Sequence, residues 1–334
     1  MRPVAATRRL VNFARADSIE LRPVDWLIKG WLVRDTLAAL VAPSGAGKSF
    51  LAVDWACRVA TGKPWYGRDV QQGAVFYLAG EGRQGLRKRI AAWESFHREP
   101  IARAPLMIAD GLPVLADDIN AAGVINAMNE AAEELFFHSG CEPQLVVIDT
   151  LARAMAGADE NSAQDMGALI GSLDWMRREW GCTVLVLHHT GHAAADRARG
   201  SSALYAALDS EFLIKPGDNA FSLKASKCKD WRPPEPLPLR WAEVEIAVPN
   251  DDPDGPAEIP ESSRAIADDQ GAVIERSKVD TVHHLFDQGM SYREIAKDTR
   301  ISKSTVERWL KGRGVPPIHG ESITNPNCPG GTPP

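Results

Sequence analysis

The sequence predicts an α/β protein with a mostly parallel central β-sheet, followed by a small all-α domain that contains a helix-turn-helix. Three observations lead to this prediction. Apolar runs of strand length alternate with helical patterns through most of the chain, as they do in parallel sheets. A glycine-rich loop lies between the first of these runs and a helix. Near the C-terminus, short helical segments that begin at serines replace the strand pattern. The apolar runs are 37–41, 74–79, 145–148 and 183–187.

The composition is that of a globular protein. The chain has 334 residues, of which 44% are hydrophobic and 25% charged, and these proportions are ordinary. No apolar run approaches the roughly 18 residues that cross a bilayer, so we expect no membrane partner. The five cysteines are scattered without a CxxC pair, which indicates reduced thiols and a cytoplasmic location. A mitochondrial-type presequence is the alternative that Arg8, Arg9 and Arg15 leave open.

The charge is unevenly distributed along the chain. The formal net charge is −6, yet residues 249–270 carry seven acids against one base and residues 271–319 carry nine bases against six acids. An acidic, proline-containing segment before a basic unit is typical of a linker and a separate domain. We therefore expect an N-terminal arm (1–22), an α/β domain (23–248), an acidic linker (249–272), a helix-turn-helix domain (273–315) and a disordered tail (316–334).

The glycine-rich loop indicates a nucleotide site. It reads Ala42-Pro43-Ser44-Gly45-Ala46-Gly47-Lys48-Ser49, and a helical pattern follows from Phe50. Glycines let backbone N–H groups close around a phosphate at a helix N-terminus, where the helix dipole favours anions. Lys48 is expected to contact the β- and γ-phosphates of ATP, and the Ser49 hydroxyl to bind Mg²⁺. All residues from Ala42 to Phe50 are candidate nucleotide contacts. Because Ala42 replaces the usual first glycine, a surface glycine-rich turn is the alternative.

Two acids follow apolar runs at the expected carboxyl edge of the sheet, where open α/β sheets bind ligands. Asp149 ends the run from Leu145 in the Walker B pattern and is expected to hold the Mg²⁺ shell. Glu81 lies between two glycines after the 74–79 run, and it is the candidate general base for an attacking water. For Glu81, a helix N-cap or a solvated surface acid is the alternative.

Two histidines, His188 and His189, end the fourth apolar run. A polar side chain at this strand end can contact both the γ-phosphate and the following loop, so both are candidate phosphate sensors. His192 is close in sequence, which makes metal binding a second interpretation. Adjacent residues on a strand point to opposite faces, however, so His188 and His189 cannot easily share one ion. A purely structural role is the third interpretation.

Five segments together resemble the RepA-type replicative helicases of plasmids and phages, a branch of the RecA/DnaB-like hexameric P-loop ATPases. They are APSGAGKS, YLAGEG, LVVIDTLARAMAGADENSAQDM, GCTVLVLHHTGH and RARGSSALYAALDSEFLI, within residues 25–245. The resemblance implies a RecA-like fold, a homo-oligomeric ring of six subunits with ATP between neighbours, and separation of duplex DNA. It also implies that Lys48 and Ser49 bind nucleotide, Asp149 coordinates Mg²⁺, Glu81 activates water and His188/His189 sense the γ-phosphate.

The same resemblance points to DNA contacts in the centre of the ring. The loop 190–201 follows the histidine pair, and its Arg197 and Arg199 are candidate ligands of single-stranded DNA phosphates. A ring also needs a cation that reaches the neighbouring subunit's ATP. Arg199 is one candidate, and the cluster Lys224, Lys227 and Lys229 after an expected strand at 221–224 is another. Asp209 and Glu211 depart from relatives that have a base in this region.

The region 275–315 reads as three short helices. Val279, Val282 and Phe286 share one face of the first, and Ser291 to Glu294 and Ser304 to Glu307 form capping boxes that open the other two. The string GMSYREIAKDTRISKSTVERWLKG resembles helix-turn-helix domains of resolvases and regulators, whose second helix enters the major groove. The expected duplex contacts are Ser302, Lys303, Ser304, Thr305 and Arg308. A structural three-helix bundle for protein contacts is the alternative.

The leading hypothesis from these features is an ATP-driven DNA helicase or translocase for plasmid or phage replication. Two others stay open: a RecA-like recombination or repair ATPase, and a DNA-binding regulator or loader whose ATPase domain acts as an assembly switch. Intact Lys48, Ser49, Glu81 and Asp149 argue against an inert domain. They do not distinguish strand separation from switching.

Overall fold

The computed structural model describes residues 14–80, 83–190, 201–217, 220–250, 256–267, 281–282, 285–286, 289–299 and 301–310, without the side chains of 308 and 309. The expected tail 316–334 lies outside these ranges. The chain divides into two compact units. The first comprises Met1–Leu86, Ile101–Pro216 and Ser222–Leu237, and the second comprises Arg87–Pro100, Gly217–Phe221 and Pro238–Pro334.

Nine strands in the described ranges form one sheet with the order β11-β10-β9-β8-β3-β7-β6-β4-β5. The strands from β8 to β5 in this order are parallel, whereas β10 and β11 pair antiparallel. This arrangement confirms the predicted fold class. The bounds are β3 Leu37–Ala42, β4 Ala74–Ala79, β5 Leu106–Ile108, β6 Pro143–Asp149, β7 Thr183–His189, β8 Ser210–Pro216, β9 Ala220–Cys228, β10 Leu237–Pro249 and β11 Glu258–Ala267. A separate pair joins β1 (Trp26–Ile28) and β2 (Leu32–Val33).

The helices begin and end where local chemistry dictates. Asp117 and Ser162 accept hydrogen bonds from backbone N–H groups at the starts of α3 and α5, and glycines in the left-handed region follow α1, α3 and α5. The bounds are η1 Ala16–Ser18, α1 Lys48–Thr61, α2 Arg83–His97, α3 Asp118–Ser139, α4 Leu151–Ala154, α5 Ala163–Trp180, α6 Ser202–Ala207, α8 Tyr292–Thr299 and α9 Lys303–Leu310. No helix of the described ranges has the length and apolarity for crossing a membrane.

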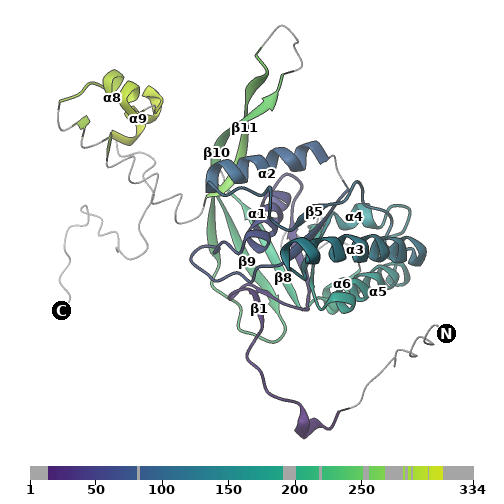
Figure 1. Cartoon of the computed structure of the whole chain (residues 1–334). Helices are drawn as coiled ribbons and strands as arrows, with labels where there is room; N and C mark the ends of the chain where they lie inside the picture. The colour runs from purple at the N-terminus through teal and green to yellow at the C-terminus, as the bar shows by residue number, and fades with distance from the viewer. Residues whose placement is uncertain are drawn as a thin grey trace, which may run out of the picture. The chain divides into compact units, whose positions relative to one another are not determined.

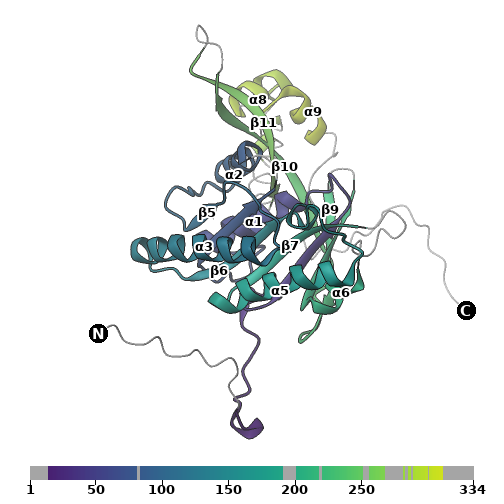
Figure 2. The same ribbon diagram turned by 90° about the vertical axis from the view of Figure 1, so that its right-hand side faces the viewer.

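Helices cover both faces of the parallel strands, which explains why these strands are apolar throughout. On one face, Leu37, Ala39 and Val41 of β3 pack in a core with residues of α3, α5 and α6. Figures 1 and 2 show these three helices as neighbours along the strands. On the other face, Trp55 of α1 packs edge-on against Phe212 of β8 with a centroid distance of 5.4 Å. The parallel strands are thus the middle layer of the first unit.

A buried ion pair fixes α1 in this layer. Asp54 and Arg58 lie one turn apart, and both side chains are only 1% exposed. The Asp54 carboxylate accepts from Arg58 Nε at 3.2 Å and from the Trp65 indole N–H at 2.8 Å. Arg58 also donates to the Pro64 carbonyl. A buried charge without such partners is strongly unfavourable, so these contacts hold the end of α1 to the chain that follows it.

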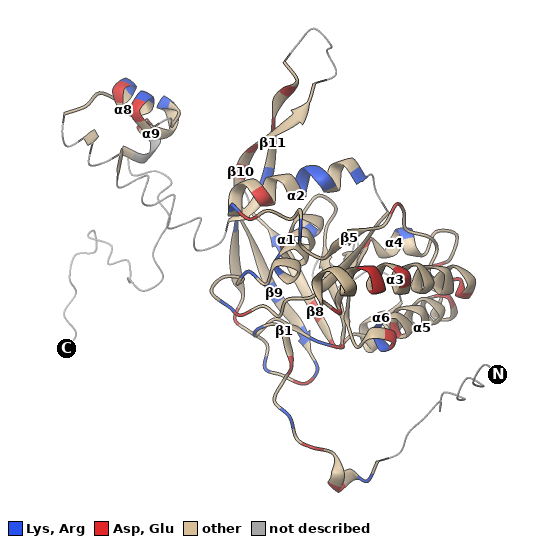
Figure 3. Cartoon of the chain, in the orientation of Figure 1, with Lys and Arg blue, Asp and Glu red and all other residues tan. Residues whose placement is uncertain are grey.

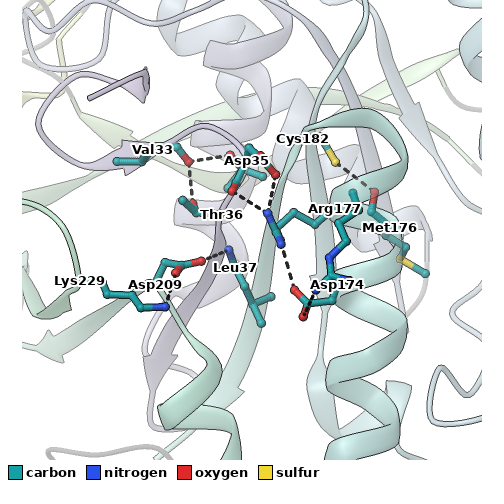
Figure 4. Close-up of polar contacts among 12 residues, drawn as sticks. Val33, Asp35, Thr36, Leu37, Asp174, Met176, Arg177, Cys182, Asp209 and Lys229 are labelled. Atoms are coloured by element: carbon teal, nitrogen blue, oxygen red, sulfur yellow. Dashed lines mark hydrogen bonds and ion pairs between the residues drawn. The ribbon is translucent and has the colours of Figure 1, made fainter. Parts of the chain in front are cut away.

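Polar contacts join the starting ends of several strands (Figure 4). The backbone N–H of Leu37, at the start of β3, donates to Asp209 Oδ2 at 3.0 Å, and Lys229 Nζ lies 3.2 Å from Asp209 Oδ1. Arg177 of α5 donates to Asp35 Oδ1 at 2.6 Å. Asp209 therefore orders the amino end of the sheet, opposite the glycine-rich loop.

In the second unit, β10 and β11 form a long antiparallel ladder from Arg240↔Ala267 to Pro249↔Glu258. The second half of α2 packs on this hairpin through Ala92, Val244 and Ala265, and the first half of the helix carries the basic band visible in Figure 3. Lys88 Nζ lies 2.7 Å from a Glu261 carboxylate oxygen. Residues 258–267, which were expected to belong to the acidic linker, are thus a strand. The strand was not anticipated because most of its side chains are polar and exposed at the sheet edge.

Candidate nucleotide-binding site and DNA-binding helices

The glycine-rich loop leaves β3 at Ala42 and enters α1 at Lys48. Gly47 is the N-cap of α1 with φ +94°, a backbone conformation that a side chain makes unfavourable. Having no side chain, Gly47 cannot cap the helix, and the first N–H groups of α1 are left for an anion. The helix begins two residues before Phe50, the start expected from the sequence. The sequence-predicted strand–loop–helix arrangement is therefore present.

The Lys48 ammonium lies at the point where the loop meets two strand ends. The side chain is 6% exposed, and Nζ donates to the carbonyl oxygens of Ala42 and Pro43, both at 3.0 Å. It also lies 3.2 Å from His189 Nδ1. The strand register accounts for this contact, because Ala42 of β3 and His189 of β7 are Cα partners. The structure thus brings together two residues that lie 141 positions apart in the chain.

The two histidines at the end of β7 point to opposite faces of the sheet, because side chains alternate along a strand. His188 is fully buried, opposite Val41, whose side chain belongs to the core beneath α3 and α5. His189 is half-buried and lies beside Lys48. The contact with the loop therefore comes from His189, and His188 points to the other face. His192, the third histidine of the metal interpretation, lies outside the described residues.

Asp149 ends β6 next to the strands that carry the other candidate residues. It is the Cα partner of Ala79 on β4 and of Leu187 on β7. Its carboxylate is 8% exposed, and Oδ2 accepts a 2.7 Å hydrogen bond from the Tyr77 hydroxyl. Sequence reasoning missed Tyr77, although a phenol in an otherwise apolar strand and in register with the Walker B strand is a usable signal.

The residues present fit a magnesium ion. Ser49, in the first turn of α1, and Asp149 supply a hydroxyl and a carboxylate, and oxygen atoms are the ligands that Mg²⁺ prefers. Mg²⁺ usually keeps several waters and binds one or two carboxylates together with substrate phosphates. Ser49 and Asp149 would supply ligands of that kind, beside the phosphates and waters, rather than a dedicated cage of protein ligands.

Gly80 fixes the chain between β4 and the candidate base. Its N–H donates to the Asp149 carbonyl oxygen at 2.6 Å, and a Cβ at this position would lie 2.6 Å from Arg153 Cβ and Cγ. No other residue fits there without displacing Arg153. Glu81 itself lies outside the described residues, as do Arg197 and Arg199, so their predicted roles stay predictions.

Of the three lysines at and just after β9, two make contacts with other residues of the chain. Lys227 Nζ donates to the Tyr205 and Ala206 carbonyl oxygens at the end of α6 and lies 4.7 Å from the Tyr205 ring centroid. Burial, followed by the nearby charge of Lys229, lowers the pKa of Lys227 below its ordinary value. Lys229 pairs with Asp209. Lys224 is exposed and makes no hydrogen bond or ion pair with any described residue.

The C-terminal helices form a small core of their own, in which Val282, Ile295 and Val306 are fully buried. The first capping box is confirmed: Ser291 N–H donates to Glu294 at 2.8 Å, and Glu294 N–H donates to Ser291 Oγ at 3.4 Å. These bonds lower the pKa of Glu294, chiefly through the backbone N–H of Ser291. Helices α8 and α9 carry basic and acidic side chains (Figure 3).

Two details of this domain differ from expectation. Helix α9 begins at Lys303 instead of after Ser304, because Ser302 Oγ accepts from Thr305 N–H and acts as the cap. Phe286, expected on the buried face, is 42% exposed and rests against the Tyr292 ring at 5.6 Å. Of the predicted DNA contacts, Ser302, Lys303 and Ser304 are exposed and Thr305 is half-buried. The Arg308 side chain lies outside the described set.

Comparisons with known proteins agree with this two-part organisation. A family model described as "AAA domain" matches residues 2–195, and one described as "Homeodomain-like domain" matches residues 284–316. Among solved structures, one ATPase domain is similar over 62% of this chain and 82% of its own, with 15% identity and a TM-score of 0.48. A KaiC-like protein from Pyrococcus horikoshii is similar over 64% and 89%, with 16% identity and a TM-score of 0.44. Because the first family model covers more than half of the chain, the protein belongs to the AAA domain family, and its C-terminal region is similar to homeodomain-like helix-turn-helix domains.

Proposed function

We propose that this chain is an ATP-dependent DNA helicase or translocase of RepA type, which acts in plasmid or phage replication as a ring of six subunits. The observation that carries the proposal is the contact of Lys48 with His189, which links the nucleotide loop to the strand from which the candidate DNA loop departs. In such an arrangement, binding or hydrolysis of ATP would change the contact of His189, and the proposed DNA-binding loop begins directly after this residue.

ATP hydrolysis would use the groups gathered at the ends of β3, β4, β6 and β7. The N–H groups of the loop and of the first turn of α1 bind the phosphates, and Lys48 exchanges its carbonyl partners for β- and γ-phosphate oxygens. Ser49 and Asp149 hold Mg²⁺. The ion supplies charge neutralisation on the phosphate oxygens as the bond to the γ-phosphate breaks.

Glu81 is proposed to accept the proton of the attacking water. Its support is its position two residues after Ala79, whose Cα partner across the ladder is Asp149. Gly80 directs the chain past the Asp149 carbonyl immediately before Glu81. The carboxyl edge, at which β4 ends before Glu81, is where open α/β sheets bind their ligands.

His189 is proposed to report the presence of the γ-phosphate, because Lys48 leaves its contact with Nδ1 when it moves to the nucleotide. His188 would act from the buried face of the same strand. For the cation that acts on a neighbour's ATP, Lys224 joins Arg199 as the candidate, since Lys227 and Lys229 are engaged within their own subunit.

DNA is proposed to bind in two places. Arg197 and Arg199 would contact phosphates of a single strand inside the ring, and α9 would lie in the major groove of a duplex with Ser302, Lys303, Ser304, Thr305 and Arg308 toward it. A single such domain makes few phosphate contacts and binds weakly. Six tethered copies bind far more tightly through effective concentration.

The test is unwinding of a forked duplex that carries a fluorophore and a quencher, with the wild-type chain and with Lys48→Ala. We expect ATP- and Mg²⁺-dependent strand separation by the wild type and loss of at least about 10³-fold in turnover by the variant. The matched control is Lys29→Ala, which removes an exposed lysine that pairs with Asp69. Unchanged turnover in Lys48→Ala would disprove the site. DNA-stimulated hydrolysis without unwinding, by a chain of verified oligomeric state, would favour the assembly switch instead.

A further inference from the structure

The hydrogen bond from Tyr77 to Asp149 joins two strands at the centre of the candidate metal site. Tyr77 Oη lies 2.7 Å from Asp149 Oδ2, and the two side chains are 1% and 8% exposed. On β4 and β6, Tyr77 is the Cα partner of Val147, two residues before Asp149. Residues at such diagonal positions share a face of the sheet and are close enough for a long side chain to reach.

A buried tyrosine usually has a hydrogen-bond partner for its hydroxyl. The contact could therefore be purely structural, with Asp149 serving only to satisfy the Tyr77 hydroxyl. The surroundings argue for more. The other residues of β4 are Ala, Val, Phe, Leu and Ala, and all are buried. Phenylalanine in place of Tyr77 would fill the same space without needing a polar partner. The strand instead carries a donor aimed at the one carboxylate that ends β6.

We propose that Tyr77 is a positioning residue of the Mg²⁺ site. Its hydroxyl donates to Asp149 Oδ2 and so restricts the rotation of the carboxylate about its terminal bond. Without such a bond, this torsion angle has a broad distribution. The other oxygen of the carboxylate then keeps one orientation, in which it would bind Mg²⁺. Partners that orient a ligand in this way commonly contribute about 10–100-fold to metal affinity. The inference rests on the proposed function, because it assigns Tyr77 a role in Mg²⁺–nucleotide binding.

The experiment compares the full-length wild type, Tyr77→Phe and Tyr292→Phe. Tyr292→Phe is the matched control because it removes the same hydroxyl from the helix-turn-helix domain. The readout is the affinity for a fluorescent ADP analogue with and without Mg²⁺. For Tyr77→Phe we expect unchanged affinity without Mg²⁺ and a loss of about 10–100-fold in the enhancement that Mg²⁺ provides. The Mg²⁺ concentration for half-maximal ATP hydrolysis should rise, and Mn²⁺, which binds oxygen sites more strongly than Mg²⁺, should restore much of the affinity.

A double-mutant cycle makes the result decisive even if Tyr77→Phe lowers stability. In an Asp149→Asn background, Tyr77→Phe should have no further effect on the Mg²⁺ enhancement, because its target is gone. Equal losses of affinity with and without Mg²⁺, or a wild-type Mg²⁺ profile in Tyr77→Phe, would overturn the inference. Absence of Mg²⁺-dependent nucleotide binding in the wild type would instead overturn the proposed function, so the two failures are distinguishable.

Discussion

The Lys48 ammonium lies 3.2 Å from His189 Nδ1 while it also donates to the Ala42 and Pro43 carbonyl oxygens. The glycine-rich loop is thus connected through one side chain to the end of β7. A cation with these partners must exchange at least some of them to contact a triphosphate. In the proposed function, this exchange would couple nucleotide binding to His189 and the end of β7.

Replacing His189 tests this coupling. His189→Ala should leave ATP affinity within about threefold and lower DNA-stimulated turnover by roughly 10²–10³-fold, as loss of one preorganised polar contact to developing charge does elsewhere. Steady-state hydrolysis with and without DNA, together with nucleotide titration, measures both effects. His138→Ala, an exposed histidine at the end of α3, is the control. Equal turnover of His189→Ala and the wild type would remove His189 from the mechanism.

We expect the two lysines of β9 to have different roles, structural for Lys227 and functional for Lys224. Lys227→Ala removes contacts with two carbonyl oxygens and an aromatic ring, so it should lower the free energy of unfolding by about 1–2 kcal/mol. Lys224→Ala should leave stability unchanged, since it has no such contact within the described ranges, and should reduce turnover.

Mixed oligomers distinguish action on a neighbour from action within a subunit. Lys224→Ala subunits have an intact nucleotide loop, and Lys48→Ala subunits have an intact Lys224. Mixing the two should restore part of the ATPase activity if Lys224 acts across the interface. Activity that equals the sum of the separate variants would contradict this role.

Duplex binding should depend on the first turn of α9. Lys303→Ala, at an exposed position, should weaken binding uniformly across sequences and reduce the slope of log K against log salt by about 1. Lys297→Ala on α8 is the control for loss of an exposed lysine from the same domain. Fluorescence anisotropy at several salt concentrations gives both values. Deleting residues 271–334 should weaken duplex binding and leave ATP hydrolysis intact. An unchanged duplex affinity and salt slope after the deletion would argue for the protein-contact alternative.

Cysteine reactivity provides a pH-dependent test of the core. Burial raises the pKa of the Cys182 thiol from 9.0 to about 12. Because the folded-state pKa is the higher one, the unfolded chain loses this proton first, and the contribution of Cys182 to stability declines as pH rises from about 9 toward 12. At pH 8.5, alkylation followed by mass spectrometry should modify the half-exposed Cys141 and spare Cys182 until the protein is unfolded. Rapid native labelling of Cys182 would show that β7 is not packed as described.

Sequence reasoning located the four central strands to within two residues at each end. Runs such as 74–79 are recognisable because strands buried on both faces are apolar throughout. The same reasoning missed β11, whose polar residues form a strand only through pairing with β10. It also misplaced the start of α9, where Ser302 and Ser304 were equally good caps by sequence alone. At helix ends and edge strands, several local conformations are compatible with the sequence, and the tertiary contacts select one of them.

By itself, the sequence determined the strand–loop–helix arrangement before Lys48, the acid at the end of β6 and the first capping box of the C-terminal domain, because each depends on residues within a few positions of one another. Only the tertiary structure decided that Tyr77 contacts Asp149, that Lys48 contacts His189, and that Asp209 accepts a hydrogen bond from the N–H of Leu37. These pairs are 72, 141 and 172 positions apart. Contacts over such separations follow from the register of parallel strands, which is set by packing on both faces of the whole sheet and has no local signature.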